Sequence, residues 1–139
     1  MLPKKITYTD FNGEEKTETF YFNLTEAELA KMQLSSIASL DVMIKNLIET
    51  DDREKIVEIF DKFILMSYGE RSIDGKYFKK EDSIRGRYAD DFKASGAYNA
   101  LFMELVTDTK AVTDFINGIL PAKLKEMNAS NAENHPALK

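Results

Sequence analysis

Few residues of this sequence have the type and spacing that catalysis or metal binding requires. The 139-residue chain has a single histidine, His135, and no cysteine, which excludes disulfides, thiol nucleophiles and thiolate metal ligands. His135 has no carboxylate or nucleophile at a recognisable catalytic spacing. We therefore expect it to be a solvated tail residue, and we predict no catalytic residue and no metal site.

The carboxylates also fail to form a recognisable site. They occur as adjacent pairs at Glu14-Glu15, Asp51-Asp52, Glu81-Asp82 and Asp90-Asp91. Adjacent helical residues point about 100° apart, so the last two pairs do not present two carboxylates to one substrate. Helix caps and solvated faces explain the pairs better than acid–base catalysis. Asp74-Gly75 lacks the ligand spacing of a calcium loop, and the six glycines form neither a phosphate loop nor a dinucleotide fingerprint. No cofactor is predicted.

Charge and hydropathy exclude two further classes of function. The net charge is −5, and no concentrated basic face stands out that would neutralise nucleic-acid phosphates. No apolar run approaches the roughly 18 residues of a membrane span. The N-terminus alternates instead of entering an apolar signal core, so we expect an intracellular protein.

The aromatic residues lie on a predicted β-hairpin at residues 5–23. β-branched and aromatic residues alternate with a period of two on both sides of Asn12-Gly13, a preferred turn pair. A two-stranded hairpin alone is marginally stable, so its aromatic face must lie on helices or on another chain. Because the edge of the hairpin is open, a homo-oligomer is possible.

Helices are predicted to follow over residues 25–128. Thr25 and Glu28 have the form of a capping box, with Leu24 and Leu29 as a hydrophobic staple. A second amphipathic segment spans 40–48, after a break at Ser35-Ser36 and before one at 50–52. A third helix is expected to end at Gly69.

Beyond that helix, Asp74-Gly75 predicts a turn and a possible second short hairpin. Residues 81–93 are expected to be helical with an interruption at Gly86, and Ser95 and Asp108 are expected to cap two further helices. The prediction is a predominantly helical α+β fold with about five or six helices. Residues 1–128 form a single globular domain, followed by a flexible tail at 129–139.

Two groups of residues are candidates for binding another protein. The run 20–22 places aromatics on both faces of one strand, and the apolar residues of the helix after Ser95 cover more than one face. Internal packing and a partner-binding surface both remain open for these groups, and either the Phe20 and Phe22 face or the Tyr21 face of the hairpin can be the inner one. The candidates are Phe20, Tyr21, Phe22, Tyr98, Phe102 and Met103.

Three stretches together resemble a known family: "ITYTDFNGEEKTETFYFNLTEAELAKM" (6–32), "IVEIFDKFILMSYGERSIDGKYFKK" (56–80) and "AYNALFMELVTDTKAVTDFINGILP" (97–121). The chain is similar to the small tail assembly chaperones of long-tailed bacteriophages and prophages of Gram-positive bacteria. The resemblance implies a non-enzymatic protein of the host cytoplasm that binds the tape-measure protein and is absent from the mature virion. Unassembled tail tube subunits are a second candidate client, and many members also have a longer, frameshifted form.

An alternative within the same biological context is a structural tail or head–tail connector component that stays in the virion. An enzyme or a nucleic-acid-binding regulator is disfavoured by the acidic balance and by the missing polar constellation.

Overall fold

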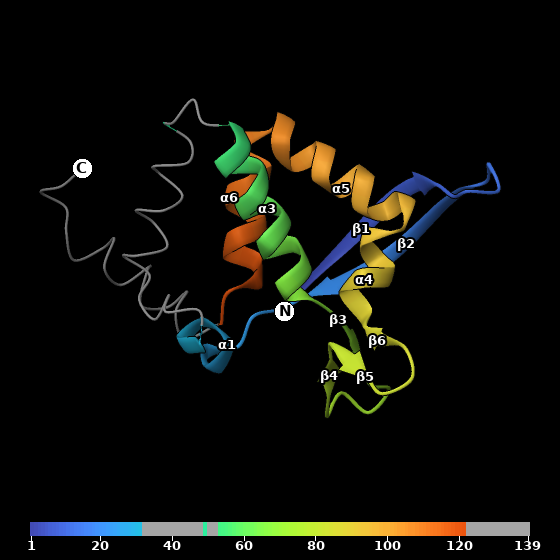
Figure 1. The fold of residues 1–139 in the computed structure, drawn as a ribbon, viewed down its shortest axis with the longest axis vertical. Helices are drawn as coiled ribbons and strands as arrows, with labels where there is room; N and C mark the ends of the chain where they lie inside the picture. Colours follow the sequence, from blue (N-terminus) through green and yellow to red (C-terminus); the bar gives the residue numbers. More distant parts are fainter. Residues whose placement is uncertain (32–48, 50–52, 122–139) are drawn as a thin grey trace, which may run out of the picture.

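The fold is a four-stranded antiparallel sheet with helices packed against it (Figure 1), in the order β1-β2-β3-β4. The computed structural model describes residues 1–31, 49 and 53–121. Within these residues there are five helices, and a separate two-stranded ribbon joins β5 to β6. The predicted α+β class is confirmed. The segment 40–48, its flanking breaks and the tail at 129–139 lie outside the described residues.

The predicted hairpin is confirmed, with a longer loop than expected. β1 (Leu2–Thr9) pairs with β2 (Glu15–Phe22) in continuous register from Leu2↔Phe22 to Thr9↔Glu15. The Asp10 carboxylate accepts hydrogen bonds from the backbone N–H groups of Asn12 and Glu14 at 2.9 Å. Gly13 takes φ 84°. The local Asp10 bonds therefore replace a two-residue Asn-Gly turn by a loop over residues 10–14.

The hairpin is the first part of a larger sheet. β3 (Tyr68–Arg71) pairs with the end of β2 through Tyr21↔Gly69 and Phe22↔Tyr68, and β4 (Phe78–Lys79) pairs with β3. The chain turns between β3 and β4 at Gly75, which has φ 75°. The second hairpin at Asp74-Gly75 is therefore confirmed.

The third helix ends close to Gly69 as predicted, but not through a glycine C-cap. Helix α3 (Arg53–Ser67) ends two residues earlier, where the Ser67 hydroxyl donates to the Phe63 carbonyl at 2.6 Å. Gly69 lies inside β3, and a Cβ there would come within 2.6 Å of the Phe78 ring. Close approach of that ring, and not a helix C-cap, explains why glycine occupies this position.

The prediction of a helix over residues 81–93 is wrong in its first half. β5 (Glu81–Asp82) and β6 (Gly86–Arg87) form a short ribbon, and only α4 (Tyr88–Lys93) is helical. The Asp82 carboxylate accepts from the N–H groups of Ile84 and Arg85 at 2.8 and 2.6 Å, while Gly86 has φ 72°. These side-chain hydrogen bonds stabilise a turn in this segment in place of the predicted helix.

Three predicted helix starts are confirmed. At α1 (Glu26–Lys31), the Glu28 N–H donates to Thr25 Oγ1 at 3.1 Å and the Thr25 N–H donates to Glu28 Oε1 at 3.0 Å. Ser95 caps α5 (Gly96–Thr107), and Asp108 caps α6 (Thr109–Ile119) by accepting from two N–H groups. Polar caps at the first turn thus set where these elements begin.

The core lies between the sheet and the helices and is rich in aromatic rings. Phe22 is fully buried, and its ring lies 5.3 to 5.7 Å from those of Tyr68, Phe92 and Phe115. Tyr68 and Phe92 stack at 4.4 Å, and Phe20 packs on Phe92 at 5.2 Å. The inner face of the hairpin is therefore the Phe20 and Phe22 face, and Tyr21 points outward.

Candidate partner-binding surfaces

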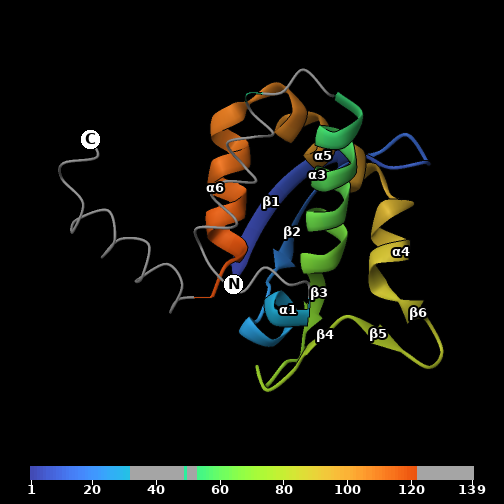
Figure 2. The same cartoon turned by 60° about the vertical axis from the view of Figure 1, so that its left-hand side comes forward.

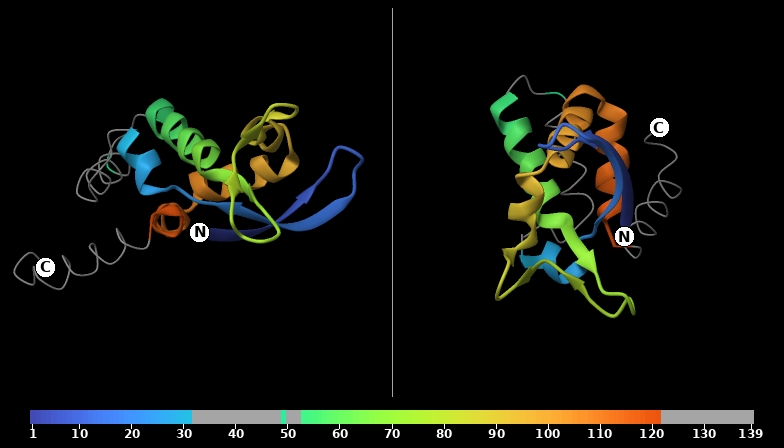
Figure 3. Two further views of the ribbon diagram at one scale, coloured as in Figure 1. Left: turned by 90° about the horizontal axis from the view of Figure 1, so that it is seen from below. Right: turned by 90° about the vertical axis from the view of Figure 1, so that its right-hand side faces the viewer.

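The face of the sheet that carries Tyr21 is turned away from the core. Figure 3 shows α3, α4 and α5 on the opposite face of the hairpin. The Arg71 guanidinium lies 4.7 Å from the centre of the Tyr21 ring, and its Nη2 donates to the Tyr21 hydroxyl at 3.4 Å. Pro3 pairs with Tyr21 across the hairpin, and the Phe78 ring covers Gly69. We call Pro3, Tyr21, Arg71 and Phe78 the outer sheet face.

Toward the loop, the same side of the hairpin becomes polar. Thr7 and Thr17 face one another with their hydroxyl oxygens 2.9 Å apart, and Lys5 pairs with Thr19. β3 pairs with β2 only at Tyr21 and Phe22, so the described strands leave the remaining edge of β2 unpaired. The outer side of the hairpin is therefore aromatic at Tyr21 and polar toward the loop.

The six predicted partner-binding residues lie in different environments. Phe20 and Phe22 belong to the core, and Tyr21 belongs to the outer sheet face. Tyr98 is half-buried and donates its hydroxyl proton to Asp61 on α3. Burial is the larger cause, and this hydrogen bond the second, that raises the pKa of Tyr98 well above its usual value. Phe102 stacks on Tyr98 at 5.8 Å, and Met103 is exposed.

A second exposed apolar surface lies where α3 and α5 meet. The Tyr98–Asp61 hydrogen bond joins the two helices, and the next turns beyond it carry Val57 on α3 and Phe102 on α5. Val57, Met103 and Val106 expose 43%, 49% and 37% of their surface, and Phe102 is half-buried beside them along α5. We call these four residues the α3–α5 patch. Val57 was missed from the sequence because it lies beside the main apolar stripe of its helix.

A third surface lies at the turns of the two short ribbons. Ile73 and Ile84 are almost fully exposed and Tyr77 is half-exposed. We call these three residues the turn end. Sequence reasoning missed them, although apolar residues beside the turn signals of Asp74-Gly75 and Gly86 were visible in the sequence.

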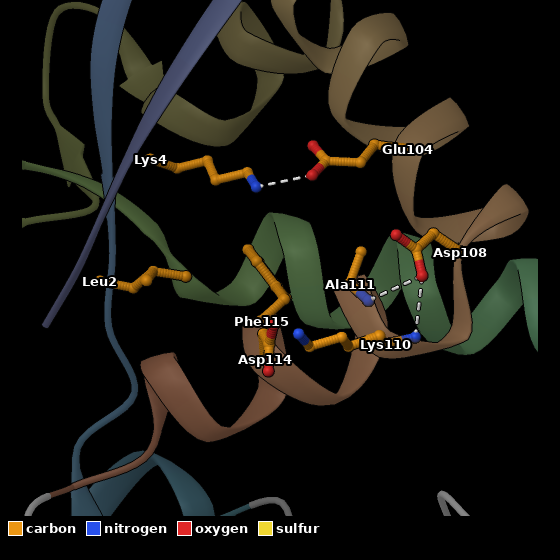
Figure 4. Close-up of a pocket in the computed structure, with 8 residues that line it drawn as sticks. All are labelled: Leu2, Lys4, Glu104, Asp108, Lys110, Ala111, Asp114 and Phe115. Atoms are coloured by element: carbon orange, nitrogen blue, oxygen red, sulfur yellow. Dashed lines mark hydrogen bonds and ion pairs between the residues drawn. The ribbon is translucent and has the colours of Figure 1, made fainter.

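A groove of about 280 Å³ lies between β1, α5 and α6 (Figure 4), and three of its charged side chains, Lys4, Glu104 and Asp108, have partners. Lys4 pairs with Glu104 at 2.8 Å across it, and Asp108 is occupied as the cap of α6. No group of three His, Cys, Asp or Glu residues that could hold a metal occurs in the part of the chain that the structure describes. The lining of this groove contains no serine, threonine, cysteine or histidine.

Lys80 is a partly buried cation with a structural role. The Lys80 ammonium pairs with the Glu28 carboxylate and donates to the carbonyl oxygens of Asn23 and Met66 at 2.8 and 2.7 Å. Burial lowers the pKa of Lys80, and Glu28 opposes that shift. All three donors of the ammonium are therefore used to hold the start of α1 against the end of α3.

Exposed aromatic and apolar surfaces are thus what the described residues most clearly offer to other molecules. A family model described as "Phage tail assembly chaperone" matches residues 1–139, the whole length of this sequence. The chain belongs to the phage tail assembly chaperone family. No curated protein and no solved structure matches it. In this tail assembly chaperone, no helix among the described residues is long and apolar enough to cross a membrane.

Proposed function

We propose that this tail assembly chaperone binds the tape-measure protein of its phage, in the host cytoplasm, and keeps it soluble until the tail tube polymerises around it. The observation that carries the proposal is the family match over the whole chain. The role is non-enzymatic, and the protein leaves before the virion is mature. Unassembled tail tube subunits are a second client of the same activity.

The physical need for such a protein follows from its clients. A tape measure is a long helical protein with apolar stripes, and a tube subunit has strand edges that are made to polymerise, so either aggregates if it is unprotected. The net charge of −5 keeps a chaperone–client complex soluble.

The outer sheet face is the surface that we assign to the client. Tyr21 presents an aromatic ring held in place by Arg71, and a preorganised tyrosine binds apolar surface at a low cost in conformational entropy. The Arg71 guanidinium adds a donor for carboxylates of the client. Because the tail tube must displace the chaperone, each chaperone–client contact has a modest affinity. Many chaperone copies along one client supply the overall binding strength.

The test is co-expression with the tape-measure protein of the same phage, scored by the soluble fraction of the tape measure and by co-purification. Wild type raises the soluble fraction, and Tyr21→Ala reduces both readouts while its thermal unfolding stays close to that of wild type. Thr19→Ala is the matched control, since Thr19 lies two residues away on the same face of β2. A tape measure that stays insoluble and unbound, with this chain present in purified virions, would establish a structural virion component instead.

A further inference from the structure

The two outer edges of the β1–β2 hairpin differ in how far they are covered. α5 and α6 lie beside β1 (Figure 2), and a Cβ at Gly96, the first residue of α5, would lie 2.5 Å from the Thr9 carbonyl oxygen. Along β2, β3 pairs only with Tyr21 and Phe22. Within the described part of the chain, no strand pairs with the outer edge of β2 at residues 15–19. The described helices therefore cover one edge of the hairpin, whereas the described strands leave part of the other open.

The hydrogen-bond register of the hairpin fixes which backbone groups reach that edge. The Asp10 N–H donates to the Glu14 carbonyl oxygen at 2.8 Å. In an antiparallel pair, hydrogen-bonded and non-hydrogen-bonded positions alternate, so the even-numbered pairs of the register, such as Tyr8↔Lys16, bond to one another. The odd-numbered pairs point their N–H and C=O groups away from the partner strand, toward the outer edges of the hairpin.

The bond between the end of β2 and the end of α3 agrees with this alternation. The Asn23 N–H donates to the Ser67 carbonyl oxygen at 2.7 Å, and Ser67 directly precedes β3, so odd-numbered residues of this strand point their backbone groups toward the β3 side. The N–H and C=O groups of Glu15, Thr17 and Thr19 consequently point to the open part of the edge. Unpaired backbone groups along an exposed strand edge are a template for an additional strand.

Two of the charged side chains near this edge are turned to partners within the hairpin. Charges on an edge strand commonly prevent the pairing of another chain. Here Lys16 Nζ lies 3.0 Å from Asp10 Oδ2, and the Tyr8 hydroxyl donates to Glu18. Glu15, at the loop end, is thus the one charge on the outer side of residues 15–19. The register continues without a bulge, and the two exposed threonines of this segment are of a type that pairs well across strands.

We propose that residues 15–19 of β2 bind one extended strand of an unassembled tail tube subunit by strand addition. The N–H and C=O groups of Glu15, Thr17 and Thr19 pair with the backbone of that strand, which continues along β2 from the place where β3 leaves it. A helix cannot bind here in the same way, because its backbone groups already bond to one another. The edge therefore fits the client with unpaired strands and not the helical tape measure.

This role of the β2 edge rests on the proposed function, through its second client. It gives the two clients different sites, with the tape measure on the outer sheet face and the tube subunit on the open edge of β2. A subunit strand that is paired with β2 cannot pair with another subunit, so the chaperone prevents premature polymerisation at that strand.

Amide hydrogen exchange measured by NMR tests the pairing directly. The probe is the purified tail tube subunit of the same phage, added below the concentration at which it polymerises. In the free chaperone the amides of Glu15, Thr17 and Thr19 exchange fast, whereas those of Lys16 and Glu18 are protected by β1. Bound tube subunit slows the first three by at least about tenfold. Unchanged exchange of these amides in the complex overturns the strand addition.

Thr17→Pro removes one N–H from the open edge. Because that N–H makes no bond to β1, the hairpin stays paired, and binding of the tube subunit in isothermal titration calorimetry weakens at least about tenfold. Thr7→Pro is the matched control, since Thr7 lies opposite Thr17 and its N–H points to the edge that the helices cover. Both variants lose the 2.9 Å contact between the two hydroxyl groups, but only Thr17→Pro loses affinity. Thr17→Val keeps the N–H and binds like wild type.

The outcomes separate this role from the proposed function. Thr17→Pro solubilises the tape measure as wild type does, because the outer sheet face is unchanged. A wild type that solubilises the tape measure but does not bind the tube subunit overturns the strand addition alone, as does wild-type affinity in Thr17→Pro. Edge amides that exchange slowly in the chaperone alone also overturn it, because residues outside the described ranges or a second copy then cover the edge. A wild type that leaves the tape measure insoluble overturns the proposed function instead.

Circular dichroism and thermal unfolding check that the proline variants are folded. Thr19→Pro takes the place of Thr17→Pro if the latter unfolds, since the Thr19 N–H points to the same edge.

Discussion

Lys80 and Glu28 form an ion pair between residues 52 positions apart in the chain. The same ammonium also binds the Asn23 and Met66 carbonyl oxygens, so one side chain joins the start of α1, the end of α3 and the strand region after β4. The Lys80 side chain is only 25% exposed. An interaction of this kind depends on both partners, since removing one leaves the other partly buried without its counter-charge.

Lys80→Met is therefore expected to lower the free energy of unfolding by roughly 2 kcal/mol, because it leaves a carboxylate and two carbonyls without their donor. Urea unfolding followed by circular dichroism measures the change. Lys79→Met is the control, because Lys79 is exposed, and it is expected to change stability little. Equal effects of the two substitutions would show that the Lys80 contacts are not specific.

The pH dependence of stability tests the role of Glu28, the other member of the ion pair with Lys80. Burial acts to raise the pKa of Glu28, but the bonds from Lys80 and Thr25 outweigh it and hold the pKa below its usual 4.5. A carboxyl with a lowered folded pKa stabilises the fold above its unfolded pKa and loses that contribution as the pH falls through the folded value. The melting temperature should thus fall on acidification below about pH 4.5, and less steeply in Glu28→Gln. Identical slopes in both proteins would refute this role for Glu28.

Gly69→Ala is expected to destabilise the protein by roughly 1 to 3 kcal/mol, because a Cβ at this position would lie 2.6 Å from the Phe78 ring and 2.9 Å from the Lys79 carbonyl oxygen. Chemical denaturation gives the value. Combining it with Phe78→Leu should recover only part of the loss, since the backbone contact with Lys79 remains. A neutral Gly69→Ala would mean that β4 moves aside freely.

Neighbouring aromatics of β2 should respond very differently to truncation. Phe22→Ala is expected to cost roughly 3 to 5 kcal/mol, since Phe22 is fully buried among three other rings. Tyr21→Ala removes only a half-exposed ring and its contact with Arg71, so a loss of about 1 kcal/mol or less is expected. Thermal unfolding compares them, and a Tyr21 variant as unstable as the Phe22 variant would contradict the assignment of faces.

The parts of the fold that the sequence predicted are those decided by local chemistry. The alternation of the hairpin and the caps at Thr25, Ser95 and Asp108 each depend on residues within a few positions of one another. Gly69 was misread because the C-terminal signal of a helix and the close approach of a distant ring both call for glycine. The Phe78 ring that decides between them is brought there by the β3–β4 pairing.

The exposed candidate surfaces were less predictable than the elements. Tyr21 and Met103 were found because an aromatic or apolar residue fell outside the expected face. Ile73 and Ile84 were not, because an isolated apolar residue in a turn looks the same in sequence whether it is buried or exposed. Phe20 and Phe22 could be assigned to the core only once Phe92 and Tyr68 were placed against them.

The sheet joins two parts of the chain that are synthesised at different times. The β1–β2 hairpin closes a short local loop and can form within microseconds, whereas β3 starts directly after α3 and reaches β2 only after residues 23–67 have been made. Until then Phe20 and Phe22 lack Tyr68 and Phe92, which complete their packing. This tail assembly chaperone therefore passes through an interval on the ribosome in which the apolar rings of its own hairpin are uncovered.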